Sequence, residues 1–121
     1  MDEICFSAAS DVDCDVTNFG QLCWHVNGER TPGTGMTLGE VTIAVGQKNP
    51  LHVHDNAEEV LYLIDGALEH RVGDETFRMG PGDVVRVPIG VPHDGRNIGD
   101  TPARMVVAYN HPQRTFIVVG E

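Results

Sequence analysis

The sequence is poor in basic residues, and this scarcity narrows the range of partners. It has 8 lysines and arginines against 18 aspartates and glutamates, which gives a formal net charge of −10. An electrostatic field of this sign repels nucleic acid and anionic membrane surfaces, because both carry dense negative charge. We therefore expect neither as a partner, and a small molecule is the better default.

Cysteine is also scarce. The sequence has three cysteines, an odd number, and no two of them form a Cys-x-x-Cys pair: Cys5, Cys14 and Cys23. This arrangement favours reduced, partly buried thiols over a zinc knuckle or a disulfide framework. The segment MDEICFSAAS begins with acidic residues and has only a short apolar run, so it resembles neither a signal peptide nor a membrane anchor. A cytoplasmic protein is the expectation that follows.

Helical periodicity is missing over any useful length. From Leu22 onward, short runs rich in β-formers alternate with turn signals, among them Asp65-Gly66, Gly73-Asp74 and the Gly-Pro-Gly-Asp of residues 80–83. Val41, Ile43 and Val45 alternate with polar or small neighbours, as in a half-buried strand. The pattern predicts an all-β chain with about eight to ten short strands in an antiparallel sandwich or barrel.

The chain is long enough for one hydrophobic core and too short for two, at 121 residues and 13.2 kDa. Residues 1–20 contain acidic residues and no basic one, and they lack a sustained period. We predict that they form an N-terminal arm with room for one short strand. Residues 21–121 would then form a single barrel domain.

The stretch PLHVHDNAEEVLYLIDG, residues 50–66, combines apolar strand residues with ionisable groups. His52 and His54 are separated by one residue, so in an extended segment both side chains project from the same face. Glu59 re-enters a strand after a turn and can return its carboxylate to that side. Two imidazoles and one carboxylate form part of a metal shell, although an exposed His-x-His pair without a ligand is the plain alternative.

A second segment, GDVVRVPIGVPHDGRN at residues 82–97, places His93 after a Pro-x-Gly turn. Val91 and Pro92 flank it. Such an apolar setting disfavours a charged imidazole and suits a neutral one bound to a metal.

These two segments resemble the two conserved motifs of the cupins. The first motif has glycine, five residues, His-x-His, three or four residues, glutamate, six residues and glycine, and it is matched by Gly46, His52, His54, Glu59 and Gly66. The second has glycine, five residues, Pro-x-Gly, two residues, histidine, three residues and asparagine, and it is matched by Gly82, Pro88, Gly90, His93 and Asn97. All ten positions agree. The two motifs span residues 46–97 and have predicted strands on both sides, so the resemblance covers nearly the whole chain past the arm.

The resemblance implies a double-stranded β-helix, or jelly-roll barrel, of the cupin type. It also implies one divalent metal held by His52, His54, Glu59 and His93. The rival carboxylate is Glu58, but strand alternation places Glu58 and Glu59 on opposite faces. The six-residue interval to Gly66 selects Glu59, and Glu58 is expected to be solvated.

Residues outside the motifs receive weaker assignments. Leu61 and Leu63 share the face of Glu59 and are candidates for the cavity wall, while Tyr62 should point to the other side. Met36, Met105 and Tyr109 are ordinary core or surface residues unless they reach the pocket, and Trp24 is core or a dimer contact. The remaining histidines are expected at the surface or with satisfied hydrogen bonds, with His111 able to approach the barrel mouth: His25, His70 and His111.

We expect a metal-dependent enzyme that acts on a small organic substrate able to chelate the metal through oxygen, with dioxygenase-type chemistry slightly preferred. A cyclase, isomerase, decarboxylase or lyase is an alternative, and a non-catalytic binding or sensing protein is another. The donor set accepts iron, manganese, zinc or nickel. Iron favours oxygenase chemistry, whereas a redox-inert ion favours a Lewis-acid role. The family also implies a homodimer.

Overall fold

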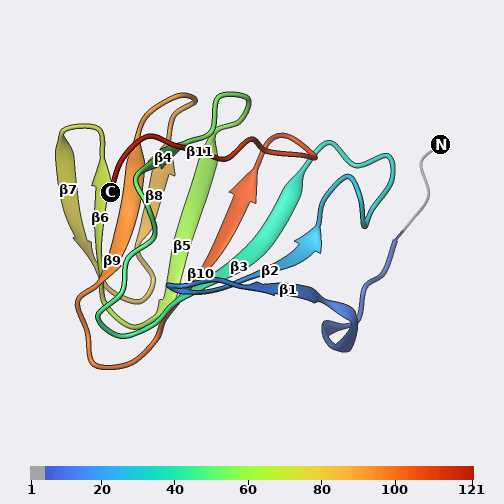
Figure 1. Ribbon diagram of the computed structural model, residues 1–121. Coiled ribbons are helices and arrows are strands. Elements are labelled where there is room, and N and C mark those ends of the chain that lie inside the picture. Colours follow the sequence, from blue (N-terminus) through green and yellow to red (C-terminus); the bar gives the residue numbers. More distant parts are fainter. Residues whose placement is uncertain (1–4) are drawn as a thin grey trace.

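The computed structural model describes residues 5–121, and within them the chain is almost entirely β-structure (Figure 1). One short 3-10 helix, η1 (Ala9–Asp11), precedes the strands. The strands are β1 (Asp13–Val16), β2 (Gly20–Val26), β3 (Thr37–Ile43), β4 (His52–Val53), β5 (Glu59–Asp65), β6 (Leu68–Val72), β7 (Glu75–Met79), β8 (Val84–Val87), β9 (His93–Asn97), β10 (Ala103–Tyr109) and β11 (Ile117–Val118).

The strands form two antiparallel sheets. The larger has the order β1-β2-β3-β10-β5-β8, and the smaller has the order β11-β4-β9-β6-β7. Neighbours such as β3 and β10 are far apart in sequence, which is the crossing pattern of a jelly roll. In Figure 1 the smaller sheet gathers on one side, and β10, β3 and β2 fan out on the other. The predicted all-β jelly-roll fold is confirmed.

The core lies between the sheets and follows the period of two. Leu61 and Leu63 on β5 are buried, whereas Tyr62 between them is 46% exposed, as the alternation predicted. Met105 and Val107 on β10 face the same interior. The expected continuation to Val45 is wrong: β3 ends at Ile43, and Val45 is exposed in the turn that follows.

The prediction of three reduced thiols is also wrong. Cys14 and Cys23 form a disulfide, and their Cα atoms are 4.0 Å apart. They stand directly opposite each other in the ladder of β1 and β2, where side chains of an antiparallel pair come within bonding reach. The prediction considered only local spacing and so overlooked this pairing across a hairpin. Cys5 is free and exposed.

β1 lies within residues 1–20, the segment predicted to be an N-terminal arm with room for one short strand. The division of the chain between residues 20 and 21 stays a prediction. The described residues contain no helix with the length and apolar character needed to cross a membrane.

Candidate metal centre

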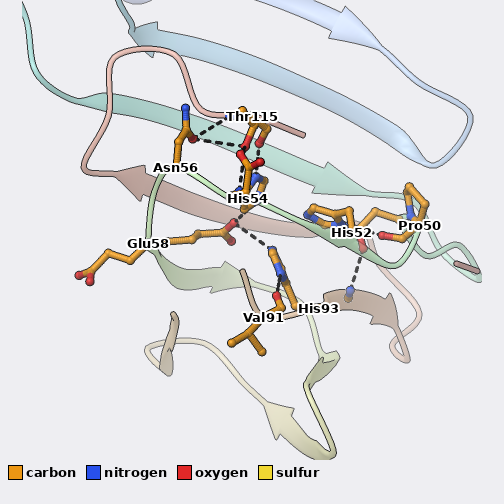
Figure 2. A network of polar contacts seen from close by, with 12 residues as sticks. Pro50, His52, His54, Asn56, Glu58, Val91, His93 and Thr115 are labelled. Atoms are coloured by element: carbon orange, nitrogen blue, oxygen red, sulfur yellow. Dashed lines mark hydrogen bonds and ion pairs between the residues drawn. The ribbon is translucent and has the colours of Figure 1, made fainter. Parts of the chain in front are cut away.

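Four buried side chains meet at one end of the barrel, and they come from both sheets (Figure 2). His52 lies on β4 and His54 directly follows it, while His93 begins β9. Glu59 begins β5 of the opposite sheet. Their ligand atoms all lie within 4.8 Å of one another. The structure therefore brings together the four residues that the sequence selected.

The three imidazoles are oriented by backbone carbonyls. Nδ1 of His52 lies 2.6 Å from the carbonyl oxygen of Pro50, and Nδ1 of His93 lies 2.9 Å from that of Val91. Nδ1 of His54 lies 2.5 Å from the carbonyl oxygen of Thr115. A carbonyl oxygen only accepts, so each Nδ1 carries the proton that is donated. Each neutral ring then keeps its lone pair on Nε2, the tautomer that binds metals.

The Nε2 atoms converge on a carboxylate. Oε1 of Glu59 lies 3.0 Å from Nε2 of His54 and 3.4 Å from Nε2 of His93. Among the described residues, the buried Nε2 of His93 has no hydrogen-bond partner. Nε2 lone pairs that face a buried carboxylate need a positive charge between them, supplied by a metal ion or by a proton on an imidazole. A set of imidazole nitrogens and one carboxylate oxygen suits a divalent transition metal, so these residues fit such an ion.

The ionisation states also suit a cation. Burial, helped by the nearby His93, lowers the pKa of His52 to about 3. Burial opposes ionisation of Glu59, but the polar contacts with the adjacent imidazoles of His54 and His93 outweigh it and hold the pKa of the carboxyl well below its usual range. Burial likewise acts to lower the pKa of His93, but Glu59 outweighs it and the pKa is raised. At neutral pH His52 is a neutral donor and Glu59 an anionic one, as a metal requires.

Glu58 takes no part in this cluster. Its side chain is 36% exposed and accepts a hydrogen bond of 3.0 Å from Arg86. Glu59 beside it is only 4% exposed at the side chain. The strand alternation that distinguished the two glutamates is thus seen in their burial.

A segment distant in sequence completes the surroundings of His54. The backbone amide of Asp55 donates to Oγ1 of Thr115 at 2.9 Å, and the amide of Thr115 donates to Oδ1 of Asn56 at 2.9 Å. Together with the carbonyl contact to His54, these bonds tie the turn after β4 to the segment before β11 (Figure 2).

A small cavity of about 30 Å³ adjoins the four residues. This volume has room for about two water molecules. Leu61, Met105, Val107 and Tyr109 form much of its wall, so Met105 and Tyr109 do reach the pocket. Leu63, the other predicted wall residue, is instead buried in the core.

His70 is a cavity residue that the sequence interpretation did not identify. It is 2% exposed, lines the cavity, and has no partner for Nδ1 among the described residues, so the expectation of a surface or satisfied histidine is wrong here. Leu68 and His70 stand two residues apart on β6 and so share one face of the strand. This spacing was the sequence signal that could have placed His70 in the interior. His25 instead contacts Glu40 at 3.1 Å, and the carbonyl of His111 accepts a bond from Thr37.

Arg114 and Phe116 also line the cavity, and no sequence motif pointed to either. The ring of Phe116 stacks on His52 with ring centres 4.3 Å apart. Both residues belong to the irregular segment between β10 and β11, which has no periodic pattern that could place its side chains.

Comparison with known proteins gives relatives of several kinds. The germin-like protein subfamily 2 member 1 of Arabidopsis thaliana is 34% identical over 102 residues, covering 76% of this chain and 46% of that protein. Polyketide synthase CurC of Streptomyces cyaneus is 38% identical over 80 residues, covering 63% and 52%. The chain thus spans about half the length of these curated relatives.

Solved structures share the fold. A Lactobacillus farciminis oxalate decarboxylase–formate complex superposes with a TM-score of 0.84 at 25% identity, covering 91% of this chain and 34% of that one. A recombinant oxalate oxidase in complex with glycolate gives a TM-score of 0.74 at 25% identity, covering 80% and 53%. The family model described as a cupin domain matches residues 39–109, more than half of the sequence. The chain belongs to the cupin family.

Proposed function

We propose that this cupin is a metal-dependent enzyme that transforms a small organic substrate able to chelate the ion through oxygen atoms. The observation that carries the proposal is the convergence of His52, His54, Glu59 and His93, with each imidazole Nδ1 held by a backbone carbonyl. A divalent ion bound there would supply positive charge and open positions for substrate oxygens.

The chain's own groups support proton chemistry beside that centre. Burial, reinforced by the carboxylate of Glu59, raises the pKa of Tyr109 well above its usual range, so its phenol stays protonated and can donate to a substrate oxygen. Burial lowers the pKa of His70 to about 4, so its imidazole is neutral at physiological pH. With Nδ1 unpartnered among the described residues, His70 is a candidate to accept a proton.

Two reaction classes follow. Dioxygenase-type chemistry, with the protein as an oxidoreductase, is the first, because a set of three imidazoles and one carboxylate suits a redox-active ion such as iron. Decarboxylation is the second, and it is supported by the likeness to an oxalate decarboxylase at 25% identity over most of this chain. The alternative of non-catalytic binding predicts a ligand recovered unchanged.

Elemental analysis of the purified protein, combined with oxygen uptake and carbon dioxide release, tests these classes. Candidate diketones, catechols, thiols and small carboxylic acids would be supplied one at a time. Oxygen consumption with bound iron supports the dioxygenase, and carbon dioxide release without oxygen loss supports the decarboxylase. Metal-stripped protein is the control, and equal turnover without metal would contradict the proposal.

We also propose a homodimer that pairs through the outer face of the larger sheet. Apolar side chains collect there at partner positions of the ladder: Tyr62 lies opposite both Val106 and Val84, and Val60 lies opposite Ala108. Tyr62 is 46% exposed and Val84 is 58% exposed. One contiguous face can meet its own copy about a two-fold axis. Light scattering of wild type and Tyr62→Glu tests this, because a dimer that uses this face would become a monomer.

The expected cytoplasmic location remains a proposal, and the Cys14–Cys23 disulfide is the feature that bears on it. Disulfides persist in oxidising compartments and are rare in reducing ones. Thiol alkylation of freshly lysed cells that express the protein distinguishes the two. Rapid labelling of both cysteines supports a reducing compartment, and protection of both argues for an oxidising one.

A further inference from the structure

Arg114 occupies an unusual position at the mouth of the barrel. It lies between β10 and β11, in the segment that crosses the end of the barrel (Figure 1). Its guanidinium carbon is 4.7 Å from the ring centre of Trp24, 5.1 Å from that of Tyr109 and 5.3 Å from that of Phe116. Three aromatic rings therefore surround one cation, an arrangement that holds it electrostatically.

The polar atoms of this guanidinium are only partly engaged by the described chain: a side-chain contact with Tyr109 acts on the pKa of that phenol. Its Nε is buried and has no hydrogen-bond partner among residues 5–121. Arg71 and Arg86, by contrast, each form an ion pair with a carboxylate, and no ion pair within the described residues includes Arg114. Aromatic rings attract the charge but leave in-plane N–H donors free, and those donors form a fork that matches a carboxylate.

Arg114 also stands between the metal cavity and the outside. It lines the inner cavity with Glu59 and His52. It lines two outer clefts as well, of about 500 Å³ and about 480 Å³, which share Trp24. Within residues 5–121, no other lysine or arginine lines any of these three spaces. Arg114 is thus a lining residue that both clefts share with the metal cavity.

We propose that Arg114 binds a carboxylate of the substrate, so the enzyme acts on a small organic acid whose remaining oxygens reach the metal. This inference rests on the proposed function of the same site. The formal charge of −10 repels anions in general, and a local cation at the cavity mouth offsets that repulsion. The inner cavity holds only a few atoms, and the outer clefts can accommodate the rest of the molecule.

Binding of glycolate and of its uncharged counterpart glycolamide tests the assignment. Titration calorimetry and the visible spectrum of cobalt-loaded protein would report binding without turnover. Wild type should bind glycolate more tightly than glycolamide. Arg114→Gln should weaken glycolate binding about tenfold or more while leaving glycolamide unchanged, because a charge-assisted bond is lost. Arg114→Lys should fall between the two, since it keeps the charge without the fork.

Arg86→Gln is the matched control, because Arg86 is an exposed arginine paired with Glu58; its glycolate affinity should equal that of wild type. The ratio of the two affinities within one variant does not depend on the stability of that variant. An unchanged ratio in Arg114→Gln with full cobalt occupancy would overturn the inference. Failure of the proposed function would be seen separately, as wild-type protein that takes up no metal. In that case, calorimetry of metal-free wild type and metal-free Arg114→Gln still tests the role of Arg114. Equal glycolate affinities of the two proteins would overturn it.

Discussion

The two sheets of the barrel differ in what they turn inward. The larger sheet presents aliphatic residues from β3, β5 and β10 over most of its length, including Ile43, Leu63 and Val107. The smaller sheet presents buried histidines, with His70 on β6 and His93 on β9. The apolar wall provides the burial that stabilises the fold. Burial also makes charged imidazoles unfavourable, and it lowers the pKa of His52 and of His70, so both rings are neutral at pH 7.

Metal affinity should depend on each of the four donor residues, three on or beside strands of the smaller sheet and Glu59 on the larger one. His52→Ala removes one donor, and we expect metal affinity to fall by about 100-fold or more, beyond the loss typical of an outer-shell change. Elemental analysis after dialysis measures this. Glu59→Gln should also weaken binding, whereas Glu58→Gln should retain the metal. The reverse behaviour of the two glutamine variants would show that the carboxylate was misassigned.

Substitutions in the apolar core should lower the stability of the fold without removing a metal donor. Leu63 is fully buried, so Leu63→Ala should lower the free energy of unfolding by about 2–5 kcal/mol through lost burial and a cavity. Urea titration measures the change, and the folded variant should keep its metal. Val45→Ala, at a position 50% exposed, should change stability by no more than about 0.5 kcal/mol. Equal losses in both variants would contradict the placement of Leu63 in the core.

The disulfide stabilises the edge of the larger sheet, away from the metal donors. Replacing both Cys14 and Cys23 by serine should reduce the free energy of unfolding by about 2–3 kcal/mol, as expected for a loop of this length. Cys5→Ser is the control and should have no effect, because that thiol is free and exposed. Metal content should stay unchanged in all three forms. Loss of metal on removing the disulfide would mean that the two halves are not separable.

His70 should make the metal-free protein sensitive to acid. Its pKa is 6.5 when exposed and about 4 when buried, so the unfolded chain takes up a proton before the folded one. Its contribution to stability is complete above pH 6.5 and is lost as the pH falls toward 4. Between pH 6.5, the ordinary pKa of histidine, and about pH 5, the wild type should lose stability through protonation of His70. His70→Gln should reduce that loss in the free energy of unfolding by about 2 kcal/mol. Urea titrations at several pH values measure this; identical slopes for variant and wild type would contradict a neutral buried His70.

Much of the candidate site could be predicted because it depends on short intervals. One intervening residue places His52 and His54 on the same face. Strand alternation separates Glu58 from Glu59, and both glutamates lie as expected. The same alternation could have placed His70 inside, since Leu68 and His70 share the buried face of β6. It was missed because no motif drew attention to that strand.

Other features could not be predicted because they depend on contacts between distant segments. Arg114 reaches the cavity from an irregular stretch, where no periodicity indicates the direction of a side chain. The Cys14–Cys23 bridge depends on the register of β1 against β2. A turn can fix such a register, but the arm was interpreted without a defined hairpin. Local patterns thus predicted the donors, and the long-range register determined what surrounds them.

The contact between His54 and the carbonyl of Thr115 joins residues 61 positions apart. On a growing chain, both first-motif histidines are made well before the group that orients one of them. Until Thr115 has been synthesised and has packed against β4, the His54 ring can rotate, and the pocket holds its ion less firmly. The donor set is therefore fully oriented only when the chain extends as far as residue 115 and the barrel is nearly complete.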